Sequence, residues 1–181
     1  HYKEGKRKYC GNTLPDGLKK NQKLEKPIIT PTTKGEKDEP ISPVDIIEKK
    51  YMTSDECNYV MGKALELFDF GQKYASQKGL ILVDTKYEFG KNTDGKIILI
   101  DELHTCDSSR YWIEKTYNSR FENNLEPEKL DKDIVRDWLR DNSKVNISKI
   151  LSTNERNILE EQVINRVYQG YKIFYDTISS V

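Results

Sequence analysis

Residues 79–90 read Gly-Leu-Ile-Leu-Val-Asp-Thr-Lys-Tyr-Glu-Phe-Gly, an apolar strand that becomes charged at every second position. Because side chains alternate between the two faces of a strand, Asp84, Lys86 and Glu88 are expected on one face, about 7 Å apart at each step. Leu80 and Leu82 precede them on that face. A surface strand does not need this order. A row of acid, base and acid favours a site that holds a phosphate, a metal ion and an ionised substrate.

An Asp-Gly turn at residues 94–95, between two β-rich runs, predicts that this strand returns as a hairpin. A two-residue loop would set Glu88 directly opposite Asp101, and a four-residue loop would set Lys86 opposite Asp101. In either register Asp101 joins the charged face. A three-residue loop with a bulge would bring Glu102 to that face instead.

Two carboxylates directly opposite each other on neighbouring strands repel, so Glu88 and Asp101 are expected to need a proton, a cation or a basic partner. Mg²⁺ is a natural choice, because proteins usually hold it with one or two carboxylates plus substrate phosphates. The alternative is a solvated hairpin with ordinary lysine–glutamate pairs. The runs at 80–83 and 97–100 are apolar at every position. This is typical of strands buried on both faces and favours a site.

Two further segments are suited to an anion. Residues 107–110, Asp-Ser-Ser-Arg, offer two hydroxyls and a guanidinium just after the hairpin, although Asp-Ser-Ser is also a common helix start. Residues 30–34, Thr-Pro-Thr-Thr-Lys, offer three hydroxyls and a lysine. For this second segment taken alone, a polar turn is the simpler explanation.

The remaining pattern predicts an α+β fold, in which an antiparallel hairpin at residues 80–102 is packed by helices. Residues 1–42 are polar and rich in turn residues, and are predicted to be an extended loop region with an edge segment at 27–34. Ser42 and Asp131 are the expected N-caps and Gly79 the expected stop. Apolar periodicity predicts helices near residues 43–50, 53–78, 131–141 and 153–178.

Composition argues against several classes of protein. The 30 basic and 30 acidic residues balance, so no global basic field favours nucleic acid as a partner. No apolar run approaches the roughly 20 residues of a membrane span, and no signal-peptide pattern is visible. Cys10, Cys57 and Cys106 are irregularly spaced, which fits reduced thiols in a cytoplasmic protein better than disulfides or a zinc site. The sequence contains no Walker loop, Gly-x-Gly-x-x-Gly motif or Ser-His-Asp pattern.

Several segments together resemble one known family. The shared motifs are D-x-K-x-E-F-G at residues 82–90, D-E…D-S-S-R-x-W at 100–112 and D-K-x-x-x-R-x-x-L at 130–139. They resemble the SAICAR synthetases (phosphoribosylaminoimidazole-succinocarboxamide synthases). Residues 2–5, 14–18 and 30–34 are similar to the longer, eukaryote-type branch of that family. The resemblance covers nearly the whole chain.

The resemblance implies a ligase of purine biosynthesis, with a fold related to the two-domain ATP-grasp and kinase-like folds. Such an enzyme joins L-aspartate to the carboxylate of CAIR (carboxyaminoimidazole ribonucleotide), giving SAICAR, ADP and phosphate. The implied chemistry is phosphorylation of the CAIR carboxylate, followed by attack of the aspartate amine. ATP and Mg²⁺ are then the expected cofactors, and CAIR and L-aspartate the expected small-molecule partners.

The resemblance also implies roles for individual residues. Glu88 and Asp101 match the residues of the Mg-ATP site and are the expected metal ligands. Asp84 and Lys86 match positions that line the CAIR side, and are the expected catalytic residues. In addition, Asp107, Ser109 and Arg110 match positions near the CAIR phosphate, and Thr32 and Lys34 belong to the matching substrate loop.

Two departures from the family pattern bear on activity. The glycine-rich hairpin that covers ATP and a Gly-Ser motif that helps bind CAIR have no counterpart, as if roughly the first 100 residues were missing. We therefore expect residues 43–181 to be the C-terminal portion of the catalytic domain, inactive without an N-terminal portion from the same protein or a separate chain. Second, Lys37-Asp38 stands where the family often has His-Asp. The competing hypotheses are a non-catalytic or regulatory module of the same fold, and a kinase-like nucleotide-binding protein of other specificity.

Overall fold

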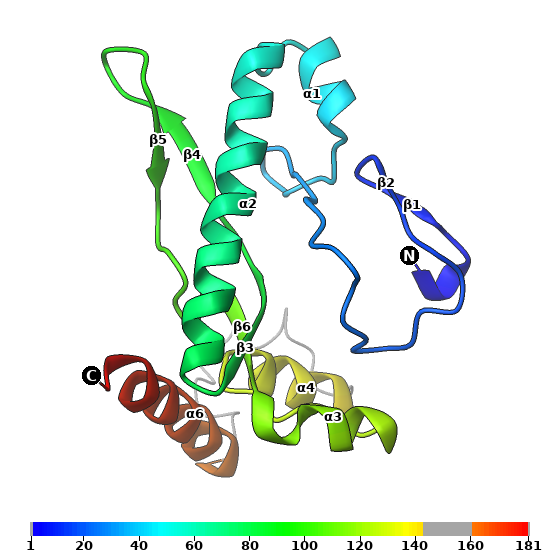
Figure 1. Ribbon diagram of the computed structural model, residues 1–181, viewed down its shortest axis with the longest axis vertical. Coiled ribbons are helices and arrows are strands. Elements are labelled where there is room, and N and C mark those ends of the chain that lie inside the picture. Colours follow the sequence, from blue (N-terminus) through cyan, green and yellow to red (C-terminus); the bar gives the residue numbers. More distant parts are fainter. Residues whose placement is uncertain (1, 143–160, 181) are drawn as a thin grey trace, which may run out of the picture. The chain divides into compact units, whose positions relative to one another are not determined.

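The computed structural model describes residues 2–142 and 161–180 of the chain (Figure 1). The chain forms two compact units, and each is built from two separate stretches of sequence. Unit 1 comprises His1–Phe70 and Glu88–Ile100, and unit 2 comprises Gly71–Tyr87 and Asp101–Val181. The long helix α2 (Ser54–Gln77) therefore contributes residues to both units.

Unit 1 contains short elements and a small apolar cluster. Ile41, Ile46 and Cys57 are buried together, and Met52 and Met61 pack against them. In addition to the first part of α2, its elements are η1 (Tyr2–Glu4), β1 (Lys8–Tyr9), β2 (Asn12–Thr13), α1 (Pro43–Glu48), β4 (Glu88–Lys91) and β5 (Ile97–Ile100).

The helix starts in unit 1 follow their capping signals. Ser42 caps α1 as predicted, because its hydroxyl accepts from the Asp45 amide at 3.1 Å while the Asp45 carboxylate accepts from the Ser42 amide. At the start of α2, the Thr53 amide donates to the Glu56 carboxylate at 2.9 Å. Lys91 on β4 forms an ion pair with the same carboxylate.

The β4–β5 hairpin adopts the register that a three-residue loop with a bulge gives. Glu88 is opposite Ile100, so both predicted pairings with Asp101 are wrong. Gly95 has a φ of +76° and its amide donates to the Asn92 carbonyl at 3.0 Å. This turn geometry, with a left-handed glycine, sets the register. Strand β5 ends before Asp101, whose own φ is +68°.

The predicted continuous strand at 79–90 is also wrong, and with it the single hairpin at 80–102. Strand β3 (Leu80–Thr85) pairs antiparallel with β6 (Ser109–Ile113) in unit 2, whereas residues 86–87 lie in no strand. The physical reason is that β6 supplies two buried aromatic side chains, with Tyr111 opposite Leu82 and Trp112 opposite Ile81, so each face of β3 gains an aromatic neighbour. The run at 97–100 was also predicted to be buried on both faces. This is wrong for β5, because Ile98 and Ile100 are exposed.

A bulge shapes the end of the β3–β6 pair. Leu82 is opposite Tyr111 and Asp84 is opposite Arg110, so Val83 is an extra residue on β3. Leu80 and Leu82 are buried, and Asp84 is exposed. The bulge therefore places an exposed acid directly across from an exposed guanidinium.

The other elements of unit 2 are helices. They are α3 (Glu114–Glu122), α4 (Asp133–Asp141) and α6 (Glu161–Ser179), and Gly79 ends α2 with a φ of +72° as expected. The structure confirms helices α1, α2 and α4, but α3 was not predicted. The N-cap of α4 is Lys132, so the prediction of Asp131 is off by one residue. Helix α6 occupies the later part of the predicted 153–178 helix, whose start lies outside the described residues.

Packing in unit 2 brings α4 and α6 together beside the strands. A Cβ on Gly170 of α6 would lie 3.3 Å from the Leu130 carbonyl oxygen, so the helix backbone approaches the start of α4 closely. The Tyr111 ring lies 4.5 Å, centroid to centroid, from that of Phe174 on α6.

In unit 1, no strand forms at 27–34, where Thr32 makes only an isolated bridge to Pro40. None of the helices described is long and apolar enough to cross a membrane.

Candidate functional site

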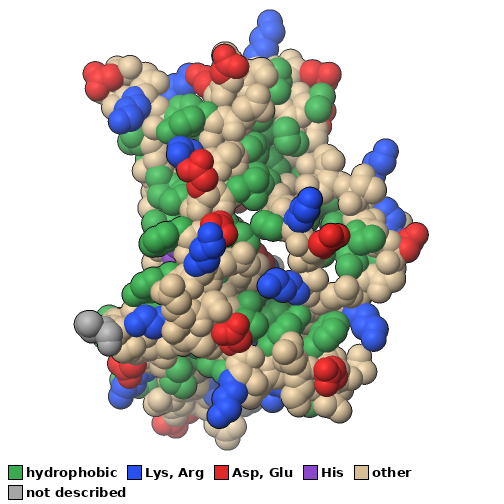
Figure 2. All heavy atoms as spheres, in the orientation of Figure 1, with side chains coloured by type: hydrophobic (Ala, Val, Ile, Leu, Met, Phe, Trp, Pro, Cys, Tyr) green, Lys and Arg blue, Asp and Glu red, His purple; other side chains and the backbone are tan. Residues whose placement is uncertain are grey.

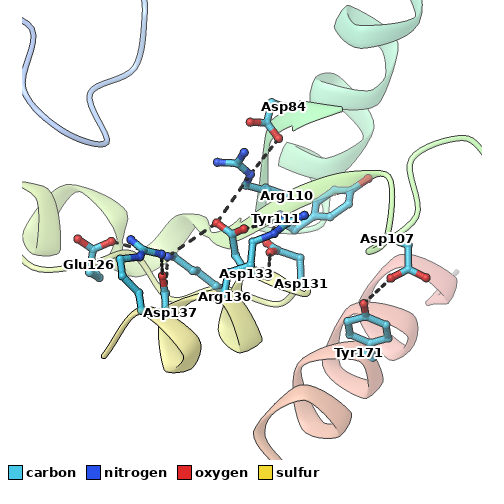
Figure 3. A network of polar contacts seen from close by, with 12 residues as sticks. Asp84, Asp107, Arg110, Tyr111, Glu126, Asp131, Asp133, Arg136, Asp137 and Tyr171 are labelled. Atoms are coloured by element: carbon cyan, nitrogen blue, oxygen red, sulfur yellow. Dashed lines mark hydrogen bonds and ion pairs between the residues drawn. The ribbon is translucent and has the colours of Figure 1, made fainter. Parts of the chain in front are cut away.

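An ion-pair network in unit 2 contains two of the predicted site residues (Figure 3). Arg110 Nε lies 3.4 Å from Asp84 Oδ1 and 3.7 Å from Asp133 Oδ2, so its guanidinium lies between two carboxylates. The contact to each carboxylate is made through Nε rather than through the Nη fork. The side chains of Arg110 and Asp84 are 45% and 51% exposed, whereas that of Asp133 is 12% exposed.

The network is anchored by a buried acid just before α4. Asp131 is fully buried, and its two carboxylate oxygens accept from the amides of Tyr111 at 2.9 Å and Asp133 at 2.8 Å. It thereby joins β6, the strand of Arg110, to the first residue of α4. A carboxylate that satisfies two buried amides fixes both backbones.

Further cations surround Asp133. Arg136 Nη1 donates to its Oδ1 at 2.7 Å, and Lys129 Nζ lies 4.0 Å from its Oδ2. Lys129 also pairs with Asp137, one turn further along α4. Burial alone would raise the pKa of Asp133, but Arg136, Arg110 and Lys129 together lower it below the ordinary value. Asp133 is therefore a carboxylate at neutral pH.

Asp84 titrates differently from Asp133. Desolvation raises its pKa, and the charge of Arg110 opposes that shift only in part. Two carboxylates that flank one guanidinium thus have pKa values shifted in opposite directions, with Asp84 holding its proton more readily than Asp133. Carboxylates with separated pKa values are a common feature of functional sites.

The Asp-Ser-Ser-Arg segment is arranged around the end of β3. The Lys86 amide donates to the Ser108 carbonyl at 2.9 Å, while the Lys86 side chain is exposed. Asp107 is exposed and accepts from the Tyr171 hydroxyl of α6 at 2.8 Å. Ser109 is buried, and its hydroxyl donates to Thr85 at 2.8 Å. The structure therefore groups Asp107, Lys86 and Ser109 with Arg110 in unit 2.

A second group of predicted residues lies in unit 1. Lys34 forms an ion pair with Glu88, although the two are far apart in sequence. The side chain of Glu88 is 17% exposed and that of Lys34 is 77% exposed. Thr32, two residues before Lys34, is held by its bridge to Pro40. The substrate-loop segment and the first residue of β4 are thus brought together.

The carboxylates suit Mg²⁺ in their chemistry. The pair with Lys34 shows that Glu88 accepts a cation, and carboxylate oxygen is the ligand type that Mg²⁺ prefers. Asp101, in unit 2, is exposed. Within residues 2–142 and 161–180, no group of three or more His, Cys, Asp or Glu side chains could hold a metal ion.

Sequence reasoning missed the residues that support Arg110, namely Asp131, Asp133 and Arg136, and also Tyr171, which bonds Asp107. The i, i+3 spacing of Asp133 and Arg136 was visible in the sequence. Their relation to Arg110 was not, because it depends on how the start of α4 packs against β6. Over the face seen in Figure 2, acidic and basic side chains are interspersed, in keeping with the balanced charge.

Comparisons with known proteins agree with these motifs. The sequence model of the SAICAR synthetase family matches residues 2–151. The phosphoribosylaminoimidazole-succinocarboxamide synthase of Arabidopsis thaliana, described as chloroplastic, is 48% identical over 179 residues. This match covers 98% of the present chain and 42% of the plant protein.

Solved structures are similar as well. The SAICAR synthase from Saccharomyces cerevisiae complexed with SAICAR has a TM-score of 0.71 at 31% identity, covering 98% of this chain and 55% of that one. A type-2 SAICAR synthetase in complex with ADP has a TM-score of 0.64 at 26% identity, covering 90% and 55%. The chain thus spans about half the length of these relatives. Because the family model matches most of the sequence, the chain belongs to the SAICAR synthetase family.

Proposed function

We propose that this chain supplies the CAIR-binding and part of the nucleotide-binding residues of an ATP-dependent ligase. The reaction joins L-aspartate to the carboxylate of CAIR and yields SAICAR, ADP and phosphate. The observation that carries the proposal is the Arg110 guanidinium, held through Nε by Asp84 and Asp133. Its Nη fork then has the bidentate geometry that a substrate phosphate requires. A SAICAR complex and an ADP complex among the similar structures support these ligand classes.

The residues of unit 2 would act on CAIR. Arg110 binds the ribonucleotide phosphate, with Asp107 and Ser109 beside it. Asp84 and Lys86 line the reacting side, where an ammonium group neutralises developing negative charge and a carboxylate with a raised pKa exchanges a proton.

The residues of unit 1 would act on the nucleotide. Glu88 would hold Mg²⁺, and Lys34 and Thr32 would contact anionic oxygens of the ligands. In unit 2, Asp101 is proposed separately as a metal ligand. ATP, when bound with Mg²⁺, supplies the phosphoryl group that activates the CAIR carboxylate. Phosphoryl transfer depends mainly on positioning and charge neutralisation, so carboxylates for the metal beside cations for phosphate are the side chains it needs.

The test is reconstitution. The portion of the Arabidopsis relative that this chain does not match is fused to the chain or added as a separate polypeptide, and ATP-dependent formation of SAICAR is measured. We expect SAICAR to form only when ATP, CAIR and L-aspartate are all present. Absence of product with all substrates saturating would contradict the ligase and favour a binding module. Product formation with another acceptor in place of CAIR would indicate a different specificity.

A variant tests the role of Arg110 in the reconstituted protein. Arg110→Ala removes charge-assisted hydrogen bonds to the phosphate, so the KM for CAIR should rise roughly 10- to 100-fold while the KM for ATP stays unchanged. The control is Arg140→Ala, which removes an exposed guanidinium that pairs with Asp137 on α4. Equal KM values for CAIR in the two variants would exclude Arg110 from the phosphate site.

A further inference from the structure

We propose that Asp133 is a positioning residue of this site, which holds the Arg110 guanidinium in the orientation that receives the substrate phosphate. The inference rests on the proposed function for the identity of that ligand. The positioning itself is a property of the chain without ligand. Asp133 lies outside the residues to which the family motifs gave a role.

Arg110 needs more than its cross-strand partner to be held in place. The pair with Asp84 has a separation of 3.4 Å, and both side chains are about half exposed. Exposed pairs of this kind contribute about 0–1 kcal/mol, whereas an arginine side chain carries about 2 kcal/mol of rotamer entropy. Asp84 alone therefore leaves the guanidinium mobile.

Asp133, in contrast, is itself fixed. Its amide is bound by the buried Asp131, its Oδ1 accepts from Arg136, and its side chain is 12% exposed. The remaining oxygen, Oδ2, faces Arg110 Nε at 3.7 Å and Lys129 at 4.0 Å. A residue fixed through both its backbone amide and one of its carboxylate oxygens provides a fixed point for the flexible guanidinium.

The contact also selects which edge of Arg110 meets a ligand. Asp84 and Asp133 both face Nε, from β3 and from the start of α4. This arrangement turns the two Nη groups away from the network, as Figure 3 shows. Without Asp133, the guanidinium can rotate and offer any of its edges, and a phosphate then has to order it on binding.

The experiment measures the order of the Arg110 side chain by ¹⁵N relaxation of its Nε–H group in the ligand-free chain. We expect an order parameter of about 0.8 in the unchanged chain and below about 0.6 in Asp133→Asn. Asp137→Asn is the matched control, because Asp137 also lies on α4 and shares Lys129 but pairs with neither Asp84 nor Arg110. Asp133→Glu keeps the negative charge and should recover most of the Arg110 order parameter. This variant keeps the positioning role testable if Asp133→Asn fails to fold.

The second measurement is the affinity of the same variants for SAICAR in the reconstituted protein. Asp133→Asn should weaken the Kd about 10-fold, and Asp137→Asn should leave it unchanged. An unchanged order parameter in Asp133→Asn, or an equal loss in Asp137→Asn, would overturn the positioning role. Unchanged SAICAR affinity in Arg110→Ala would instead contradict the proposed phosphate contact, while the order parameter still decides the role of Asp133.

Discussion

Asp131 has no solvent-exposed surface, and each of its carboxylate oxygens is used by a backbone amide, one from Tyr111 and one from Asp133. Asp131→Ala would leave both buried amides without an acceptor. Since each costs about 1–3 kcal/mol, we expect a loss of roughly 2–6 kcal/mol in the free energy of unfolding, measured by urea denaturation. Asp131→Asn keeps one acceptor oxygen and should lose less. Asp141→Ala, at the exposed end of α4, should change stability by less than about 0.5 kcal/mol.

At the same scale, the chemistry of single residues could be predicted from the sequence better than their partners. The alternation of residues 79–90 predicts that Asp84 is a site residue, which stays a prediction, and the structure places its exposed carboxylate beside a guanidinium. That this guanidinium belongs to Arg110 depends on a cross-strand register that no local pattern specifies. The role of Asp133 has a different long-range origin, because its contact with Arg110 joins the start of a helix to a strand.

At the scale of an element, alanine substitutions at two glycines of α2 should change the melting temperature in opposite directions. A Cβ on Gly71 would lie 2.5 Å from the His104 ring, which bonds the Tyr87 hydroxyl at 2.6 Å, and 2.8 Å from the buried Leu82. The overpacking costs about 1–3 kcal/mol and exceeds the gain of up to about 1 kcal/mol in helix propensity. We therefore expect Gly71→Ala to lower the melting temperature. Gly62→Ala has nothing within 4 Å of the new Cβ and should raise it.

The start of α2 makes a prediction about pH. The hydrogen bond from Lys91 and the amide of Thr53 lower the pKa of Glu56 from 4.5 to about 2. Because the pKa is lower in the folded state, the stabilisation is complete above pH 4.5 and is lost as the pH falls toward 2. The difference in melting temperature between the unchanged chain and Glu56→Gln should therefore shrink over this range. Lys91→Met should remove most of the pH-dependent part of this melting-temperature difference. A difference that stays constant with pH would contradict the role of Glu56 in stabilising the start of α2.

Elements with a strong local signal were predicted correctly, and elements that depend on distant partners were not. The apolar periodicity and the caps of α1 and α2 lie within their own sequence. The β4–β5 register depends on whether the Asp-Gly turn carries a bulge. The sequence alone was compatible with a loop of two, three or four residues. Helix α3 has weak periodicity, and its stacked pair of Tyr117 and Phe121 became visible only in the structure.

At the scale of the whole molecule, the motifs identified the family, but neither they nor the composition indicated the division into two units. Unit 1 combines the N-terminal stretch with the β4–β5 hairpin, so segments far apart in sequence share one unit. The pair of Lys34 with Glu88 is an instance of this arrangement. Charged pairs between such segments leave no periodic pattern in the sequence, so the sequence alone does not link the substrate loop to the charged strand.

The balanced charge of the whole chain predicts how it behaves in solution. Its net charge is zero and its pI is about 6.9, while large apolar side chains such as Phe70, Tyr51 and Tyr175 are exposed. Without net repulsion these side chains favour association, so solubility should be lowest near pH 6.9. The double variant Lys26→Glu, Lys115→Glu replaces two exposed positive charges with negative ones, and should raise solubility at pH 7 and move the minimum to lower pH. The matched variant Lys26→Arg, Lys115→Arg keeps the charge and should leave the precipitation curve in place. A minimum that stays fixed in the glutamate variant would show that apolar contacts alone drive the association.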